Sequence, residues 1–281
     1  MRPTARHLLA AAFACLAALP AAAQTLDRIR DAGELRIGYR EDAAPLSYAG
    51  EAGLPSGYSV LICDAIAEHL AGQLGIDVKP THVLVGAEDR FDAVVEGRID
   101  LLCGAASITL DRREIVDFSL PVFVDGAAVM LPADAPHEFE ALAGKKIGVR
   151  AGTTTEIILR NSLAAKAMEA EVVPLDNHIE GLAALEEGRI DAYFGDQSIL
   201  FALYFASDMA ENFVVSDNTL TIEKQGLALA RGDSDFRLAV DRAISDLFLS
   251  GRMADFFRES FPGAQPGLAL EALILLGPDL P

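Results

Sequence analysis

The sequence contains no tryptophan and has few basic residues relative to acidic ones. Its 281 residues include 23 lysines and arginines against 42 aspartates and glutamates, which gives a formal net charge of −19 at pH 7. This excess of negative charge argues against nucleic acid or an anionic membrane surface as a partner. It also means that any site for an anion must be built locally, from particular arginines.

Long apolar runs are scarce, and the one at the N-terminus is too short and too rich in alanine to predict a membrane span. Arg2, Arg6 and His7 precede "LLAAAFACLAALP", and small residues end this segment before Gln24. The pattern predicts a cleaved signal peptide over residues 1–23 and a protein secreted to the periplasm, the alternative being a buried N-terminal helix. Cleavage removes two arginines and no acids, so the formal charge becomes −21.

Cysteine is also scarce, with three in the chain and two, Cys63 and Cys103, after the predicted signal peptide. The sequence around Cys63 predicts the buried face of a helix, and Cys103 ends a predicted strand. In an exported protein the pair can form a disulfide, but two buried free thiols fit equally well. The five histidines are scattered without the spacing of metal ligands, so we expect no metal and no cofactor.

The chain repeats two short patterns in the same order. "EGRID" occurs at 96–100 and at 187–191, and the pattern IGxR occurs in "LRIGYR" (35–40) and in "KKIGVR" (145–150). Around both copies, strands alternate with helices, which predicts α/β units with mainly parallel sheets. The duplication predicts two similar lobes with a ligand cleft between them, a common place for a small-molecule site.

The predicted boundaries follow from the composition of the segments between the repeats. We expect the first lobe to contain residues 24–130 and 222–281, and the second lobe residues 131–221. The Pro- and Ala-rich segment 131–144 is the expected crossing into the second lobe, and 221–233 the expected return. Two crossings of this kind form a hinge, so we expect the lobes to close on a ligand.

Several segments together resemble a known family. "GELRIGYREDAAPLSYAGEAGLPSGYSVLICDAIAEHL", "EGRIDLLCGAASITLDRREIVDFSLPVF", "KKIGVRAGTTTE" and "EGRIDAYFGDQ" are similar, in this order, to the solute-binding proteins of polar amino-acid ABC importers, family 3. The resemblance implies the two-lobed type II periplasmic-binding-protein fold, an amino acid as ligand and a membrane ABC importer permease as partner. It also implies a monomer, and it is strongest to the members that bind glutamate and aspartate.

The resemblance assigns the ligand's α-carboxylate to the motif "SITLDRRE". Arg112, five residues after Ser107, matches the family's arginine, whose planar fork can make two parallel hydrogen bonds to a carboxylate. Arg113 is then a solvated neighbour. Where the family usually has Ser, Gly or Thr, this chain has Ala105.

The segment "GTTTE" opens a predicted helix in the second lobe. Thr153 and Glu156 fit a capping box, while Thr154, Thr155 and the free backbone amides suit a carboxylate, and the two interpretations are compatible. Asp196 matches the position of the family's ammonium-binding carboxylate. Its competing interpretation is the N-cap of the helix that follows.

Three further residues predict an acidic ligand. Arg40, at the mouth of the first strand, favours an acidic side chain through its fork geometry. Arg90 and His178 match positions that contact the distal carboxylate in the glutamate- and aspartate-binding members, with His178 as a donor that protonation can switch. The alternatives are a surface charge for Arg90 and a solvated loop residue for His178. Ala87 departs from the hydroxyl residue common in these members.

Two other functions fit the same resemblance. The fold also serves dehydratases that act on prephenate-like acids, and Glu41 and Asp42 would be the candidates for general acid or base. No nucleophile elbow, dinucleotide, phosphate-binding or metalloprotease motif supports an enzyme. A protein that presents its ligand to a separate membrane receptor is the other alternative.

Overall fold

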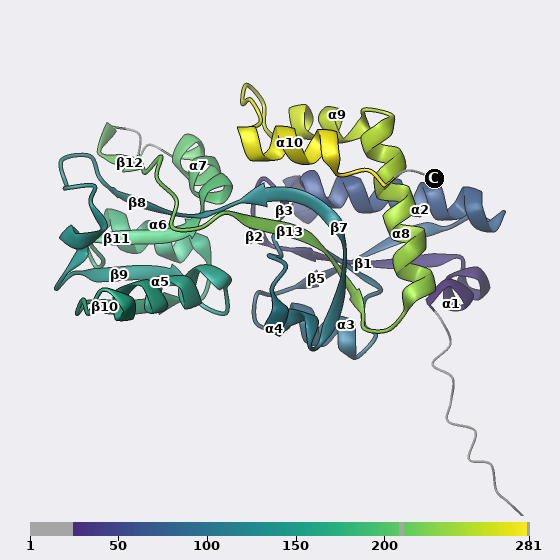
Figure 1. The fold of residues 1–281 in the computed structure, drawn as a ribbon, viewed down its shortest axis with the longest axis horizontal. Helices are drawn as coiled ribbons and strands as arrows, with labels where there is room; N and C mark the ends of the chain where they lie inside the picture. Colours follow the sequence, from purple (N-terminus) through teal and green to yellow (C-terminus); the bar gives the residue numbers. More distant parts are fainter. Residues whose placement is uncertain (1–24, 208–210, 280–281) are drawn as a thin grey trace, which may run out of the picture.

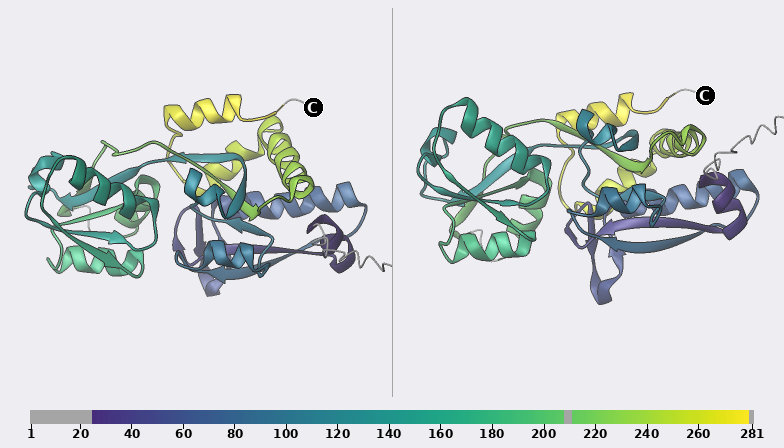
Figure 2. Two further views of the ribbon diagram at one scale, coloured as in Figure 1. Left: turned by 60° about the horizontal axis from the view of Figure 1, so that its bottom comes forward. Right: turned by 90° about the horizontal axis from the view of Figure 1, so that it is seen from below.

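Two five-stranded sheets lie side by side, and extended strands join them (Figures 1 and 2). The computed structural model describes residues 25–207 and 211–279, so the predicted signal peptide falls outside the described part of the chain. We call residues 25–125 and 223–279 lobe 1, and residues 127–215 lobe 2.

Lobe 1 has the strand order β5-β1-β6-β13-β7. Its strands are β1 (Glu34–Arg40), β5 (Lys79–Val85), β6 (Leu101–Cys103), β7 (Val116–Asp125) and β13 (Glu223–Ala230). A small separate sheet is formed by β2 (Asp42–Ala43), β3 (Ser47–Ala49) and β4 (Pro55–Ser56), with the 3₁₀ turn η1 (Glu51–Gly53) between β3 and β4. The helices are α1 (Thr25–Ala32), α2 (Tyr58–Leu74), α3 (Arg90–Val95), α4 (Leu110–Arg113), α8 (Ser234–Leu249), α9 (Arg252–Ser260) and α10 (Leu268–Leu276).

Lobe 2 has the strand order β10-β9-β11-β8-β12. Its strands are β8 (Ala127–Pro132), β9 (Lys146–Arg150), β10 (Glu171–Leu175), β11 (Ala192–Asp196) and β12 (Phe213–Val215). The 3₁₀ turn η2 (Phe139–Leu142) and the helices α5 (Thr154–Ala165), α6 (His178–Glu186) and α7 (Gln197–Ala206) complete it.

The same pattern of strand pairing recurs in the two sheets. β1 pairs in parallel with β5 and β6, as β9 does with β10 and β11, and in each sheet the next strand runs antiparallel. The two-lobed α/β fold is therefore as predicted, and the two five-stranded sheets are mainly parallel, because β13 in the first and β8 in the second each run against the other four strands. Both of these strands follow a crossing: β8 follows the passage from the first sheet to the second, and β13 follows the return.

The expected first crossing at 131–144 is wrong. β7 pairs within the first sheet up to Asp125, and β8 already pairs within the second sheet from Ala127, so the chain crosses at Gly126. Segment 131–144 lies inside lobe 2 and leads through η2 to β9. The return lies between Val215 and Glu223. The prediction failed because the direct strand-to-strand crossing at Gly126 leaves no loop signal in the sequence.

Each sheet is covered by helices on both faces. In lobe 1 the larger core joins α2, α8 and α9 to the sheet and a smaller one lies under α3. In lobe 2, α6 and α7 cover one face and α5 the other. The C-terminal helix α10 packs on lobe 1 against β7 through the buried Leu270. Among the described helices, none is long and apolar enough to cross a bilayer.

Of the two states left open for the cysteines, the structure has the disulfide. Cys63 in α2 is bonded to Cys103 at the end of β6, with 6.4 Å between their Cα atoms. Both residues are fully buried in the larger core of lobe 1. The bond fixes α2 to the strand that leads directly to Gly104 and Ala105, at the edge of the pocket described next.

Candidate functional site

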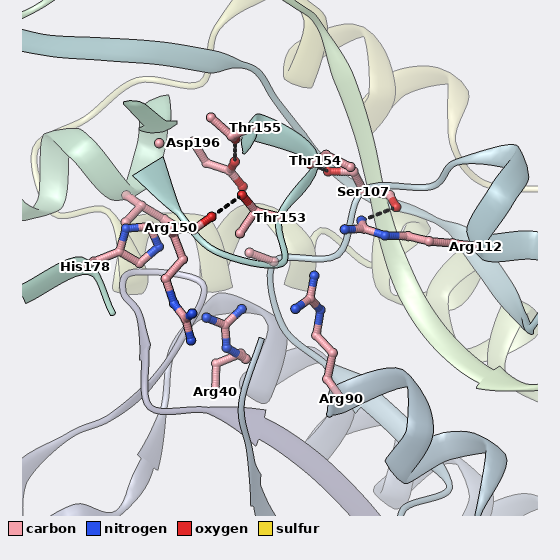
Figure 3. A pocket seen from close by; sticks show the side chains of 13 residues that line it. Arg40, Arg90, Ser107, Arg112, Arg150, Thr153, Thr154, Thr155, His178 and Asp196 are labelled. Atoms are coloured by element: carbon pink, nitrogen blue, oxygen red, sulfur yellow. Dashed lines mark hydrogen bonds between the residues drawn. The ribbon is translucent and has the colours of Figure 1, made fainter. Parts of the chain in front are cut away.

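One pocket between the lobes gathers all nine predicted site residues (Figure 3). Lobe 1 contributes Arg40, Arg90, Ala105, Ser107 and Arg112 to its lining. Lobe 2 contributes Arg150, Thr153, Thr154, Thr155, His178, Gly195, Asp196 and Ile199. Four of these thirteen residues are arginines, in a chain where acids greatly outnumber bases. The predicted local exception to the negative charge is therefore present.

Arg112 points into the pocket and Arg113 is exposed. The Thr109 hydroxyl caps the short helix α4 by accepting from the Arg112 backbone N–H at 3.2 Å. The Arg112 Nη1 donates to the Ser107 carbonyl at 2.8 Å, and its guanidinium lies 4.9 Å from the centre of the Phe91 ring. These contacts hold the Arg112 side chain in one direction while leaving donors free for an anion.

The N-terminus of α5 faces Arg112 from lobe 2. Thr153 caps this helix by accepting from the Glu156 N–H at 3.2 Å, while the Glu156 carboxylate accepts from the Gly152 N–H at 3.1 Å. The hydroxyls of Thr154 and Ser107 lie 3.2 Å apart across the cleft. The capping interpretation is confirmed for Thr153, and the helix end with its free N–H groups and positive dipole opens toward the pocket.

Asp196 ends β11 and stands at the N-cap position of α7, but its side chain makes no capping hydrogen bond. Its carboxylate instead accepts from the Thr155 hydroxyl at 3.1 Å and from Gln225 Nε2 at 2.9 Å. Burial and the nearby Glu223 raise the pKa of Asp196, although Thr155 and Arg112 act in the opposite direction. These two hydrogen bonds hold the Asp196 carboxylate at the pocket wall, and a cation beside it would offset the cost of its burial.

Arg40 and Arg90 are both buried, with 3% and 2% of their surfaces exposed. Arg40 forms an ion pair with Asp42, whereas Arg90 donates to the Ala87 carbonyl and, across the cleft, to the Gly152 carbonyl at 3.2 Å. Burial and the neighbouring arginines lower the pKa of Arg90 well below its usual range. The interpretation of Arg90 as a surface charge is therefore wrong.

The Nε atoms of these two arginines are buried and have no hydrogen-bond acceptor within the described part of the chain. Buried donors without partners are costly, and in a ligand pocket they mark the places where a ligand's acceptors fit. Neither Arg90 nor Arg112 forms an ion pair with any described carboxylate. Arg40, Arg90 and Arg112 therefore all keep guanidinium donors that are available to a ligand.

His178 is the first residue of α6 and is 4% exposed, so the alternative of a solvated loop histidine is wrong. Its Nδ1 lies 2.8 Å from the Tyr193 hydroxyl. Burial lowers the pKa of His178 to about 4, although the nearby Asp42 acts to raise it. The ring is neutral near pH 7, so the expected protonation switch is wrong for that range. When Tyr193 donates to Nδ1, the other ring nitrogen carries the hydrogen and can donate.

Arg150 is the charged residue of the pocket lining that the sequence did not predict. It ends β9 as Arg40 ends β1, and it is 6% exposed. Its Nε lies 3.1 Å from Asp42 Oδ2 and its Nη2 lies 3.3 Å from Glu88, both across the cleft in lobe 1. The IGxR repeat was the signal that could have found it, because both copies end in arginine at the same place in the fold.

The two acids considered for catalysis are placed unfavourably for that role. Glu41 is exposed, and Asp42 is held between Arg40 and Arg150. Burial acts to raise the pKa of Asp42, but Arg40, His178 and Arg150 together lower it. An aspartate kept ionised between two guanidiniums is a poor general acid. No group of three or more potential metal ligands occurs among the described residues.

Comparison with known proteins agrees with this geometry. Residues 35–262 match the family described as "Bacterial extracellular solute-binding proteins, family 3". The chain belongs to this family. It is 30% identical over 268 residues to the L-glutamate/L-aspartate-binding protein of Pseudomonas aeruginosa, covering 93% of this chain and 89% of that protein. With the glutamate/aspartate import solute-binding protein of Escherichia coli it shares 26% identity over 251 residues, or 89% and 83% of the two chains.

Solved structures of the family have the same fold. The crystal structure of an ancestral amino acid-binding protein, a precursor of cyclohexadienyl dehydratase, superposes with a TM-score of 0.75 at 27% identity, covering 84% of this chain and 99% of that one. The family membership and the two-lobed fold are thus established independently of the pocket.

Proposed function

We propose that the protein captures an acidic amino acid, glutamate or aspartate, between its lobes and delivers it to a membrane ABC importer. The observation that carries the proposal is the charge of the pocket. Four guanidiniums line it, and the carboxylates beside them are Asp42, which Arg40 and Arg150 share, Glu88, which pairs with Arg150, and Asp196. The balance leaves one positive charge, which suits a ligand with two carboxylates and one ammonium, because its net charge is −1.

The α-carboxylate fits between Arg112 and the N-terminus of α5. Arg112 offers a fork of parallel donors, and Ser107 and Thr154 add hydroxyls from the two lobes. The ammonium fits at Asp196. Burial and Glu223 raise the pKa of this carboxylate because the cations near it do not fully offset them, and the ammonium would add a positive charge. A ligand bound at these three points touches both lobes, so it stabilises the closed arrangement.

The distal carboxylate fits at Arg40 and Arg90. Their unpartnered Nε atoms are fully buried, and His178 adds a neutral donor from lobe 2. A neutral amide in this place would supply acceptors but no charge, leaving three buried guanidiniums with Asp42 and the exposed Glu88 as their ion partners among the described residues. The pocket therefore favours glutamate and aspartate over glutamine and asparagine.

The relatives support the same ligand class and the same partner. Two similar proteins are named for glutamate and aspartate, and the name of one includes import. Delivery to an importer is thus favoured over presentation to a separate receptor. The ion-paired state of Asp42 gives no support to the dehydratase alternative. The proposed binding requires no cofactor.

Calorimetric titration tests the proposal directly. The protein, unfolded and refolded to remove bound ligand, is titrated with glutamate, aspartate, glutamine, arginine and a neutral amino acid. We expect one-to-one binding of glutamate or aspartate, weaker by about tenfold or more for the amides. Tighter binding of a basic or neutral amino acid would overturn the acidic specificity, and no binding of any amino acid would overturn the function itself.

A further inference from the structure

The repeated IGxR pattern places two arginines face to face across the cleft. Arg40 ends β1 in lobe 1 and Arg150 ends β9 in lobe 2, and their side chains extend toward one another in the pocket (Figure 3). Both are almost fully buried. Two buried guanidiniums in one pocket repel each other strongly unless anions lie between them.

Asp42 supplies part of the required negative charge. One of its carboxylate oxygens pairs with Arg40 and the other with Arg150, so a single charge serves two arginines. Glu88 also pairs with Arg150, but 72% of its side chain is exposed, which weakens its effect. Arg90, the third buried guanidinium, lies close enough to Arg40 and Arg150 for both to disfavour its charge.

The contacts of Arg150 with Asp42 and Glu88 join lobe 2 to lobe 1. They therefore exist only when the lobes meet, and closure is the step that brings the charge of Arg150 up to Arg40 and Arg90. Closure without a ligand anion leaves a positive charge uncompensated in a buried site, which is unfavourable. Closure around a carboxylate that accepts from Arg40 and Arg90 removes this cost.

We propose that Arg150 is a specificity-determining residue, which makes closure favourable only around a ligand that carries a second carboxylate. This inference rests on the proposed function and deepens it. It assigns the preference for an acidic over an amide side chain to an arginine of lobe 2, in addition to the lobe 1 arginines that contact the distal group. A residue that merely latched the lobes together would strengthen the binding of all amino acids alike.

The test compares glutamate with glutamine in Arg150→Gln. Removing the charge weakens the binding of glutamate, because one cation beside its distal carboxylate is lost. The affinity of the variant for glutamine should stay unchanged or increase, because closure around an amide no longer buries an excess charge. The ratio of the two dissociation constants should fall by about tenfold or more. Arg189→Gln makes the same charge change at an exposed, ion-paired site of lobe 2 and should leave both constants as they are.

Two further variants separate charge from geometry. Arg150→Lys keeps the charge and should keep most of the preference for glutamate. Asp42→Asn combined with Arg150→Gln removes one charge of each sign and should restore the preference that Arg150→Gln alone loses, with thermal unfolding used to confirm that each variant is folded. An equal loss of both ligands in Arg150→Gln, or no change in either, would overturn the proposal.

The same data keep the two proposals distinct. Failure of the unaltered protein to bind any amino acid would overturn the proposed function. Binding of glutamate by the unaltered protein, with a glutamate-to-glutamine ratio that Arg150→Gln does not change, would overturn only the role of Arg150.

Discussion

In lobe 1 the isoleucine of the repeated "GRID" segment packs on the glycine of the IGxR strand β1, and in lobe 2 the same pair packs in the same way on β9. A Cβ atom on Gly38 would stand 2.4 Å from Ile99 Cδ1, and one on Gly148 would stand 2.4 Å from Ile190 Cδ1. The aspartate that follows accepts from a strand N–H in both lobes, from Arg36 to Asp100 at 2.7 Å and from Lys146 to Asp191 at 2.8 Å.

The two lobes differ in what surrounds this shared joint. Lobe 1 adds the Cys63–Cys103 disulfide, buries Asp100 between two arginines, and presents three arginines to the pocket. Lobe 2 leaves Asp191 exposed and presents a helix N-terminus, Asp196 and Arg150. The repeated residues thus build the scaffold, while the residues beyond the strand ends divide the binding of one ligand between unlike halves.

Removing the disulfide should have the largest effect on stability. The bond closes a segment with a sequence separation of 40 in lobe 1, which corresponds to about 4 kcal/mol of stabilisation in the chain-entropy picture. Cys63→Ala combined with Cys103→Ala, measured by urea unfolding, should destabilise lobe 1 and separate its transition from that of lobe 2. A change below about 1 kcal/mol would show that the packing of α2 alone holds the lobe together.

Arg112→Ala should have the next largest effect, on binding rather than on folding. Loss of the fork for the α-carboxylate should weaken glutamate at least about a hundredfold, or about 3 kcal/mol. Arg113→Ala is the matched control because Arg113 is exposed on the same helix. Equal effects of the two substitutions in calorimetry would show that Arg112 is not the clamp.

How much the sequence predicted follows the same division between scaffold and pocket. The repeats predicted the two-lobed fold, and the family motif predicted that Arg112 and Asp196 line the pocket, because these residues stand at fixed distances from recognisable patterns. Arg150 was missed because its role depends on Asp42 and Glu88 across the cleft, and such cross-lobe contacts have no local signature. The neutral state of His178 depends on burial among distant elements, which residue type alone cannot show.

The predicted position of the first crossing was wrong for a different reason. A loop rich in proline and polar residues is a good predictor of a break between elements, and segment 131–144 is such a break. It joins β8 to β9 within one lobe, however, and contains η2. The true crossing at Gly126 joins two strands without an intervening loop, and only the pairing partners of β7 and β8 reveal it.

The repeated aspartates offer a smaller contrast. Asp100→Ala leaves the Arg36 N–H and two arginine side chains without their acceptor in a buried place, and it should cost about 2 to 3 kcal/mol of folding stability. Asp191→Ala removes the equivalent hydrogen bond at an exposed place and should cost about 1 kcal/mol or less. Urea unfolding of the two variants side by side measures the difference. Equal losses would show that burial does not distinguish the two joints.

The smallest expected effect is the pH dependence of binding, which tests Asp196 as the partner of the ligand's ammonium. Burial and Glu223 raise the pKa of Asp196, so protons compete with a ligand's ammonium for this carboxylate at mildly acidic pH. The affinity for glutamate should therefore fall by about tenfold as the pH decreases from about 7.5 to about 5, and binding at the lower pH should release protons. Calorimetry in buffers of different ionisation enthalpy measures both quantities.

Two controls assign the pH dependence to Asp196. Glutarate has the two carboxylates of glutamate but no ammonium, so its affinity should not fall in this way, because protonation of Asp196 removes a repulsive charge for that ligand. Glu223→Gln removes the neighbour that raises the pKa of Asp196, so the loss of glutamate affinity should begin at a lower pH. A parallel fall for glutamate and glutarate would place the titrating group elsewhere, and the ammonium would then need a partner other than the carboxylate of lobe 2.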